Sequence, residues 1–321
     1  MKKTSYLTLI FLAANCIFAQ TNAAEHEWKA TLKVVDENGS PVAGANVGVG
    51  YYIGNTSKRI DGLTDTNGIF VAAHSANTSG YAVYDLAFIV EKTGYYRTWQ
   101  KQDLGVNYDT AKWNPNMTIV LEKIINPIPM YARRAQIEIP VVDKPVGFDL
   151  VESDWVAPYG KGKQSDIIFM TTRRWDSRHD FDAAVKITFP DSGDGLLVAS
   201  VPPVVGSAGP RMPVMAPLEG YIAEQQVRLS NTPANGWKGN DGDKQNYYIR
   251  VRTVLAPNGD VKSALYGKIY GGFTLDPINS KTTLILFTYY LNPTLNSRNV
   301  EFNPGKNLFQ GLPFIEQVKE P

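Results

Sequence analysis

Cysteine and histidine are scarce in this chain, and both scarcities restrict its chemistry. The single cysteine is Cys16, so the sequence beyond it offers no disulfide, no thiol nucleophile and no thiolate ligand for a metal. The three histidines, His26, His74 and His179, stand far apart in the sequence. A metal site built from three clustered histidines is therefore not expected.

Familiar motifs of hydrolytic catalysis are also missing. The sequence contains no Gly-x-Ser-x-Gly, no Ser-x-x-Lys and no His-Glu-x-x-His. Carboxylate pairs of the kind that glycoside hydrolases use are brought together only by the fold, so the sequence leaves that possibility open. The balance of these observations favours a protein that is not an enzyme.

Neither sign of charge dominates. The 32 lysines and arginines nearly match the 31 aspartates and glutamates, which gives a net charge of +1. Proteins that bind nucleic acid present a basic patch or stripe, and this composition does not suggest one. Nucleic acid is therefore not an expected partner.

The N-terminus has the parts of a secretory signal. Lys2 and Lys3 supply the positive start, and the apolar run Tyr6–Ala19 is shorter than a membrane-spanning helix. Small residues follow, which places cleavage near Ala23, with Ala19 as the alternative position, and makes residues 1–24 the signal peptide. An uncleaved anchor helix is the alternative, although polar residues interrupt the apolar run. The sequence predicts a secreted, periplasmic or outer-envelope protein with no transmembrane span after cleavage.

Cys16 lies inside this segment, and a lipoprotein signal also ends at a cysteine. Such signals place a small residue before the cysteine and polar residues after it. Here Asn15 precedes, and Ile17 and Phe18 follow. Lipid anchoring at Cys16 is therefore not expected, and the lysine-led signal with a cysteine-free remainder favours a bacterial envelope.

The remaining chain reads as all-β. Apolar residues alternate or occur in short blocks between Gly, Pro, Asn and Asp, and no long segment has a helical period. In the first block, residues 25–125, WKATLKVVD and ANVGVGYYIG are predicted strands. Asn38-Gly39 and Asn67-Gly68 are predicted turns, the second a hairpin turn of the primed type.

The first block resembles the carboxypeptidase regulatory-like, transthyretin-type β-sandwich, an Ig-like architecture. The resemblance rests on VVDENGSPVAGANVGVG, GLTDTNGIFVAA, FIVEKTGYY and MTIVLEK, in that order. The matching positions are Asp36, Gly39, Pro41, Val42, Gly44, Ala45, Val47, Thr64, Asp65, Gly68, Phe70, Lys92, Gly94 and Tyr95. The resemblance implies a non-catalytic spacer or appendage and assigns no catalytic residue. One departure, NTSKRIDGL, suggests an enlarged loop.

Residues 126–140 are the predicted linker between two domains. Three prolines in this stretch favour an extended path and disfavour a central strand. Residues 141–321 then alternate strands with turns, which predicts a second β-sandwich or a jelly roll. No named family is assigned to this part.

The segment TTRRWDSRHDFD is the densest polar and aromatic constellation. Its arginines suit carboxylate or sulfate groups, and its tryptophan suits stacking on a sugar. The candidate ligand-binding residues here are Arg173, Arg174, Trp175, Arg178 and His179. Trp155 and Tyr159, in VESDWVAPYGKGKQ, are further candidates. The alternatives are a solvated hairpin for the first segment and a structural loop for the second.

A third polar loop contains Asn240, Asp241 and Asp243. Oxygen ligands on a glycine-rich loop suit Ca²⁺, but the spacing of an EF-hand and its closing glutamate are absent. A mobile polar loop is the alternative, and no other cofactor is expected.

Three functions remain open on this evidence. The first is a non-catalytic secreted or envelope protein that binds a protein or polysaccharide partner. The second is a carbohydrate-active enzyme or a lectin-like sugar-binding protein that uses Trp155, Trp175 or Trp237. The third is a structural component of a surface assembly. Exposure of the aromatic side chains discriminates among them, because a sugar site needs an accessible planar ring.

Overall fold

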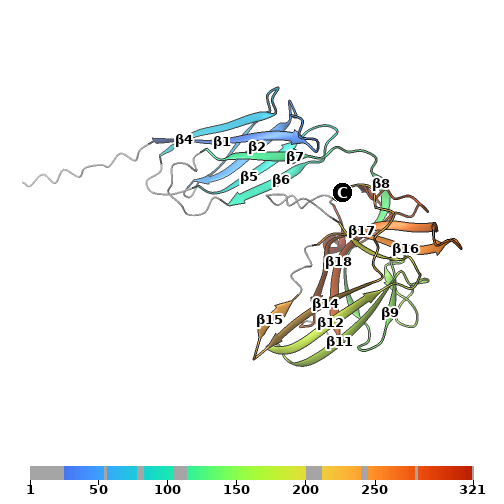
Figure 1. Ribbon diagram of the computed structural model, residues 1–321. Helices are drawn as coiled ribbons and strands as arrows, with labels where there is room; N and C mark the ends of the chain where they lie inside the picture. The colour runs from blue at the N-terminus through green and yellow to red at the C-terminus, as the bar shows by residue number, and fades with distance from the viewer. Residues whose placement is uncertain are drawn as a thin grey trace, which may run out of the picture. The chain divides into compact units, whose positions relative to one another are not determined.

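The structure is a computed structural model that describes residues 25–53, 56–77, 83–103, 114–199, 212–239, 245–278 and 281–319. The predicted signal peptide, residues 1–24 with Cys16, lies outside these ranges. The chain divides into two compact units between Lys123 and Ile124 (Figure 1). This division falls beside the predicted end of the first domain at residue 125. Both units are built from β-strands, as predicted.

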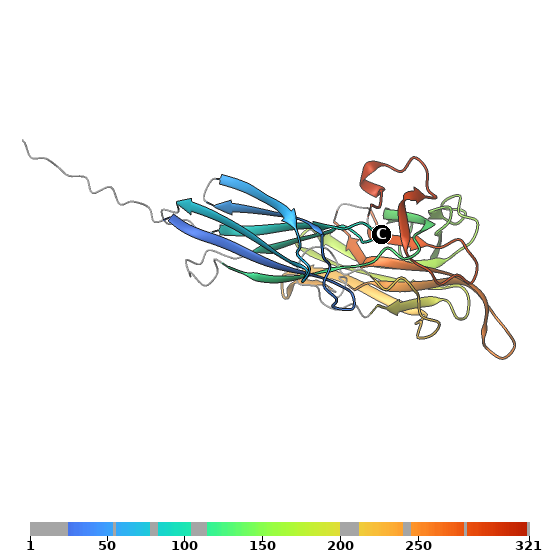
Figure 2. The same ribbon diagram turned by 90° about the horizontal axis from the view of Figure 1, so that it is seen from above.

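The described strands of the first unit form two sheets. One sheet has the order β4-β1-β7 and contains β1 (Glu25–Asp36), β4 (Ile69–Asn77) and β7 (Asn116–Leu121). The other has the order β3-β2-β5-β6 and contains β2 (Asn46–Ile53), β3 (Thr56–Leu63), β5 (Val83–Glu91) and β6 (Thr98–Asp103). The strands run lengthwise along the unit (Figure 2). Alternate residues of β1, namely Ala30, Leu32 and Val34, are buried, which confirms the predicted alternation.

Two Asp-x-Asn-Gly turns in this unit share one construction. Asp36 Oδ1 accepts hydrogen bonds from the backbone N–H groups two and four residues later, and Asp65 Oδ1 does the same. The φ angle is positive at Gly39 (80°) and Gly68 (74°) but not at the asparagine before either glycine, so neither is a primed turn. The second turn joins β3 to β4, which belong to different sheets. The expectation of a primed hairpin turn there is wrong, although the positive φ at Gly68 is correct.

The enlarged loop expected in NTSKRIDGL is also wrong, because Thr56–Leu63 is strand β3 and pairs with β2 along its whole length. As an edge strand with one face exposed, β3 has few apolar residues. Its inward position Gly62 carries no side chain, and a Cβ there would lie 2.3 Å from Cε2 of Phe70. Phe70 from β4 therefore fills the core space that a side chain at position 62 would otherwise occupy. Without an apolar side chain at this inward position, the sequence of β3 does not show the alternation typical of a strand.

The described strands of the second unit also form two sheets. The open sheet has the order β10-β9-β11-β12-β14-β15. Its strands are β9 (Val146–Asp149), β10 (Asp154–Trp155), β11 (Ile167–Ser177), β12 (Asp180–Thr188), β14 (Glu224–Thr232) and β15 (Gly236–Gly239). The covered sheet has the order β13-β16-β17-β18-β8-β19. Its strands are β8 (Ile128–Ile139), β13 (Gly195–Val198), β16 (Tyr247–Leu255), β17 (Val261–Asp276), β18 (Thr283–Leu291) and β19 (Phe302–Asn307). A short 3₁₀ helix, Phe314–Glu316, follows.

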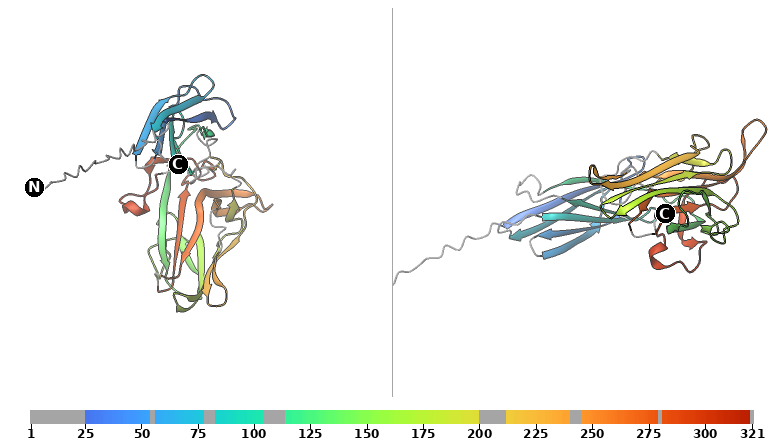
Figure 3. Two further views of the ribbon diagram at one scale, coloured as in Figure 1. Left: turned by 90° about the vertical axis from the view of Figure 1, so that its left-hand side faces the viewer. Right: turned by 90° about the horizontal axis from the view of Figure 1, so that it is seen from below.

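The predicted linker is a strand. Residues Ile128–Ile139 form β8, which lies between β18 and β19 and pairs with β18 from Tyr131 to Ile139 (Figure 3, left, green). The prediction failed because of where the prolines fall. Pro127 and Pro129 precede the residues that pair with β18, and Pro140 follows them, so no ladder hydrogen bond with β18 is lost.

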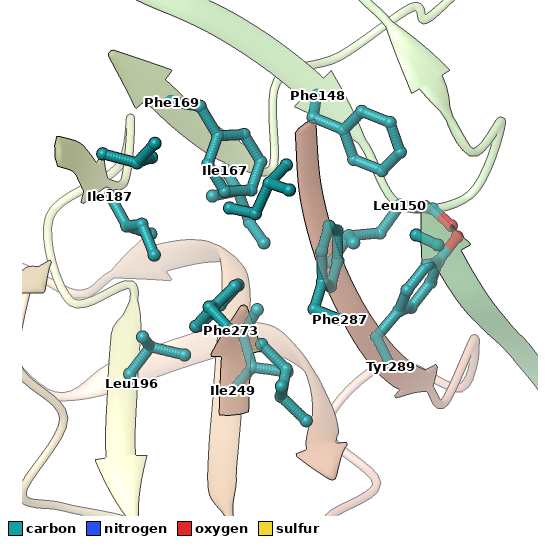
Figure 4. Packing of buried hydrophobic residues seen from close by; sticks show 14 of the residues in the cluster. Phe148, Leu150, Ile167, Phe169, Ile187, Leu196, Ile249, Phe273, Phe287 and Tyr289 are labelled. Carbon is teal, nitrogen blue, oxygen red and sulfur yellow. Dashed lines mark hydrogen bonds between the residues drawn. The ribbon is translucent and has the colours of Figure 1, made fainter. Parts of the chain in front are cut away.

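The main core of the second unit lies between its two sheets. Phe148, Phe169, Phe273, Phe287 and Tyr289 meet there from both sheets, and Figure 4 shows their rings together. The covered sheet is also packed on its other face, where a second cluster includes Tyr248, Tyr266 and Tyr290. Burial on both faces explains why β18 reads as an almost continuous apolar run rather than as an alternating strand.

Candidate functional site

The predicted ligand-binding constellation lies at the tip of the β11–β12 hairpin, and the pleat of the strand divides it. Successive side chains of a strand point to opposite faces. Arg173 and Trp175 share the inner face of the open sheet with Phe169, whereas Arg174 is on the outer face. Arg178 and His179 form the exposed turn. The five predicted residues therefore do not converge on one ligand.

Arg173 and Trp175 serve the packing of this end of the sandwich. The guanidinium of Arg173 donates to the carbonyls of Pro277 (2.8 Å) and Lys281 (2.5 Å), and its central carbon lies 4.8 Å from the Trp175 ring centroid. Trp175 in turn stacks on buried Phe181 with ring centroids 5.5 Å apart. The side chain of Trp175 is half-buried, so it is neither a free platform nor a fully buried core residue.

The prediction that Trp155 belongs to a ligand site is not supported by its position. Trp155 is 7% exposed and packs edge-on against Phe148 and Phe169, with centroids 5.2 and 5.8 Å apart. The loop bends back because Asp149 accepts hydrogen bonds from four backbone N–H groups, those of Val151, Glu152, Lys163 and Gln164. Tyr159 stays at the surface of this loop and is 43% exposed.

The outer face of the open sheet gathers polar side chains, of which the sequence analysis selected Arg174 alone. Arg174, Asp182, Ser230 and Lys238 lie opposite one another on β11, β12, β14 and β15, four strands that run side by side in Figure 1. Thr172 and Arg228 lie in the next row. We call these six residues the polar face. They come from strands far apart in sequence, and only the sheet brings them together.

A fork between Arg228 and Asp182 stands at the middle of the polar face. Arg228 Nε donates to Asp182 Oδ1 at 2.8 Å, and Nη2 donates to the other carboxylate oxygen. Hydrogen bonding and the negative charge of Asp182 raise the pKa of Arg228. Arg174 is similarly paired with Asp176 and Asp180. Carboxylates therefore compensate both guanidinium charges of this face, whereas the Lys238 ammonium donates to the amide oxygen of Asn235.

Two open hollows flank the fork and share both of its residues. One, of about 460 Å³, is also lined by Ser230, Thr232, Asn235 and Lys238. The other, of about 420 Å³, is lined by Asp143, Thr172, Arg174 and Gln226 among others. Hydroxyl, amide, carboxylate and cationic groups thus border a continuous shallow surface. Alternating polar residues in Glu224–Ser230, at every second position, are the signal that could have revealed this face.

The predicted calcium ligands Asn240, Asp241 and Asp243 lie outside the described residues. Within the described ranges, no group of three or more His, Cys, Asp or Glu side chains is arranged to hold a metal ion. The same ranges contain no helix with the length and hydrophobicity needed to cross a membrane.

No family model and no curated protein sequence matches the chain. Solved structures similar to part of it include 3-chlorocatechol 1,2-dioxygenase from Rhodococcus opacus 1CP, with 14% identity and a TM-score of 0.25 over 33% of this chain and 62% of that one. Another is hydroxyquinol 1,2-dioxygenase from Pseudomonas putida DLL-E4, with 15% identity and a TM-score of 0.21 over 30% and 57%. The chain spans less than two thirds of either dioxygenase, and likenesses this weak carry no argument about function.

Proposed function

We propose that this is a secreted or envelope protein that binds a protein or polysaccharide partner through the polar face and acts without catalysis. The observation that carries the proposal is the Arg228–Asp182 fork between two shallow hollows on an exposed sheet. Donors and acceptors fixed on strands can bind a partner without first being ordered, which lowers the entropic cost of association.

The compensated charges of the polar face suit recognition by hydrogen bonding. Each guanidinium and carboxylate in a fork retains hydrogen-bonding capacity beyond the pair, because arginine has five N–H donors and a carboxylate about four acceptor sites. Hydroxyl and amide groups of Ser230, Thr232 and Asn235 extend the same surface. A glycan or a polar protein surface supplies the complementary groups.

Features of the sequence support export and an accessory first unit. The two lysines and apolar run of residues 1–24 support a cleaved signal, and a cysteine-free remainder suits an envelope protein. The motifs from Asp36 to Tyr95 support a carboxypeptidase regulatory-like module, which would hold the second unit as a spacer.

The test compares residues 25–321 with a double variant, Arg228→Ala with Lys238→Ala. A glycan array screens for saccharides, and cross-linking to a purified envelope fraction screens for proteins. The double variant is expected to lose at least tenfold in binding. A matched control, Lys262→Ala with Lys306→Ala, removes two positive charges from exposed positions on the covered sheet and should bind normally. Equal binding by both double variants, or no binding by the unmodified protein, would contradict the proposal.

A further inference from the structure

The first unit has an exposed sheet face of its own, formed by β3, β2, β5 and β6. Asp61, Gly48, Ile89 and Trp99 lie opposite one another across these four strands. Their neighbours in sequence, such as Val47, Val49 and Phe88, are buried in the core on the other side of the sheet. We call the row of four, together with Arg59, the tryptophan face. It belongs to a different unit from the polar face.

Gly48 allows Arg59 to lie across the sheet. A Cβ at Gly48 would be 2.4 Å from Arg59 Nη2 and 2.7 Å from its Cζ, so the guanidinium occupies the space above the glycine. Asp61 Oδ1 accepts a hydrogen bond from Arg59 Nε at 2.7 Å and holds it there. The result is a planar cationic group fixed over β2 beside an open hollow of about 450 Å³, lined also by Asn46, Ile89 and Glu91.

Trp99 provides a second planar group on the same face. It is 41% exposed, and the half-buried side chain of Ile89 lies between it and Gly48 in the row. Gly48 and Trp99 are two strand spacings apart, which is about 10 Å, roughly the span of two sugar rings. An exposed indole offers a flat apolar surface, and the Arg59–Asp61 pair beside it offers donors and acceptors.

The two ion pairs of this face favour an uncharged ligand. Arg59 is paired with Asp61, and Arg97 Nε is paired with Glu91 at 2.7 Å. All four of these side chains are more than half exposed, so each pair is accessible at the surface without carrying a net charge. A planar apolar ring beside neutralised hydrogen-bonding groups matches the alternating C–H and hydroxyl surfaces of a sugar.

From these observations we infer that the tryptophan face binds a neutral polysaccharide, with one sugar ring stacked on Trp99 and hydroxyl groups hydrogen-bonded to Arg59 and Asp61. This saccharide site is independent of the partner proposed for the polar face. It gives the first unit a binding role of its own in addition to that of a spacer.

Affinity electrophoresis tests the inference with residues 25–321 in native gels that contain mixed-linkage β-glucan, xylan or galactomannan. At least one of these neutral polysaccharides should retard the unmodified protein. Trp99→Ala should weaken the interaction at least tenfold. Gly48→Ala, which displaces the Arg59 guanidinium and leaves the indole in place, should weaken it severalfold. Circular dichroism and thermal unfolding of each variant establish that the fold is kept.

Two controls make the assignment to this face specific. Trp237→Ala removes a tryptophan that is 58% exposed in the second unit and should leave retardation unchanged. The polar-face double variant, Arg228→Ala with Lys238→Ala, should also be retarded normally. The inference is overturned if none of the neutral polysaccharides retards the protein, or if Trp99→Ala is retarded as strongly as the unmodified chain. Self-association that Trp99→Ala abolishes, with no polysaccharide bound, would also overturn it.

Discussion

Replacing Arg252 with alanine is expected to destabilise the second unit by about 3–5 kcal/mol, the usual cost of leaving buried charge without its partner. Arg252 lies in an irregular part of β16 and donates from Nε and Nη2 to both carboxylate oxygens of Asp166, at 2.7 and 3.0 Å. Nη2 also donates to Asp149 Oδ1 at 3.1 Å. One guanidinium thus serves two buried aspartates.

The loss should fall mainly on Asp166. Its side chain has no exposed surface, and within the described residues the Leu150 N–H is its one other hydrogen-bond donor. Asp149 keeps four backbone donors when Arg252 is removed. The backbone at Arg252 has a φ of 55°, and alanine there bears a similar backbone strain, so the substitution isolates the side-chain contribution.

The effect should depend on pH in a defined direction. Burial raises the pKa of Asp166, and the Arg252 guanidinium opposes that rise. Without Arg252 the pKa of Asp166 rises further, so the folded variant keeps a proton at a pH where the unfolded chain has already lost it. Protonation then favours the folded state, and the deficit of the variant relative to the unmodified protein should shrink as the pH falls from 7 towards 5.

Calorimetry of residues 25–321 measures this directly. For a unit of this size, about 3–5 kcal/mol corresponds to a fall of roughly 6–20 °C in Tm. Arg228→Ala, which breaks an exposed fork, should cost no more than about 1 kcal/mol. Adding Asp166→Asn to Arg252→Ala should restore part of the stability. The reasoning is refuted if Arg252→Ala and Arg228→Ala lower Tm equally, or if the added asparagine brings no recovery.

Three further predictions concern the turns, the core and a buried carboxyl group. Gly68→Val should destabilise the first unit more than Gly39→Val, which should cost about 1–3 kcal/mol by strain alone. Both glycines have positive φ, but a Cβ at Gly68 would lie 2.3 Å from Val34 O, whereas one at Gly39 meets no atom within 4 Å; thermal unfolding compares them. Trp155→Ala should cost the second unit about 3–5 kcal/mol in urea unfolding, and a loss below 1 kcal/mol would mean the ring is not core. Burial raises the pKa of Asp194 to about 6, so its stabilising contribution is lost as the pH rises through 6. Asp194→Asn should lack that decline when unfolding is measured between pH 4 and 7.

The all-β class and several strands could be predicted because their signals are local. Alternation in WKATLKVVD reports one buried face, and a glycine after Asp-x-Asn reports a backbone with positive φ. The two strands that were not predicted lack such a local signal. The edge strand β3 has a glycine at its inward position because Phe70 comes from another strand, and β8 has prolines only outside the residues that pair with β18.

The candidate site was less predictable, because proximity in sequence and proximity on a strand differ. Arg173, Arg174 and Trp175 are consecutive, yet the pleat sends Arg174 to solvent and the other two towards the end of the core. Asp182 and Arg228 are 46 residues apart, and they form the fork because β12 and β14 pair in that register. A β-protein makes its surface sites from rows across strands.

The same geometry explains why a tryptophan beside charged residues in the sequence is a poor guide to function in this chain. Trp155 and Trp175 stand beside charged residues in sequence, but each packs against phenylalanine in the structure. Trp99 has uncharged residues, Thr98 and Gln100, on either side in the sequence. Its surroundings are created by strands β2 and β3, where a glycine makes room for a guanidinium held by an aspartate. The absence of a side chain at Gly48 is therefore as important to that surface as the indole. Gly48→Ala tests this directly: weaker polysaccharide binding would show that the placement of the Arg59 guanidinium contributes to the site, and unchanged binding would show that Trp99 acts without it.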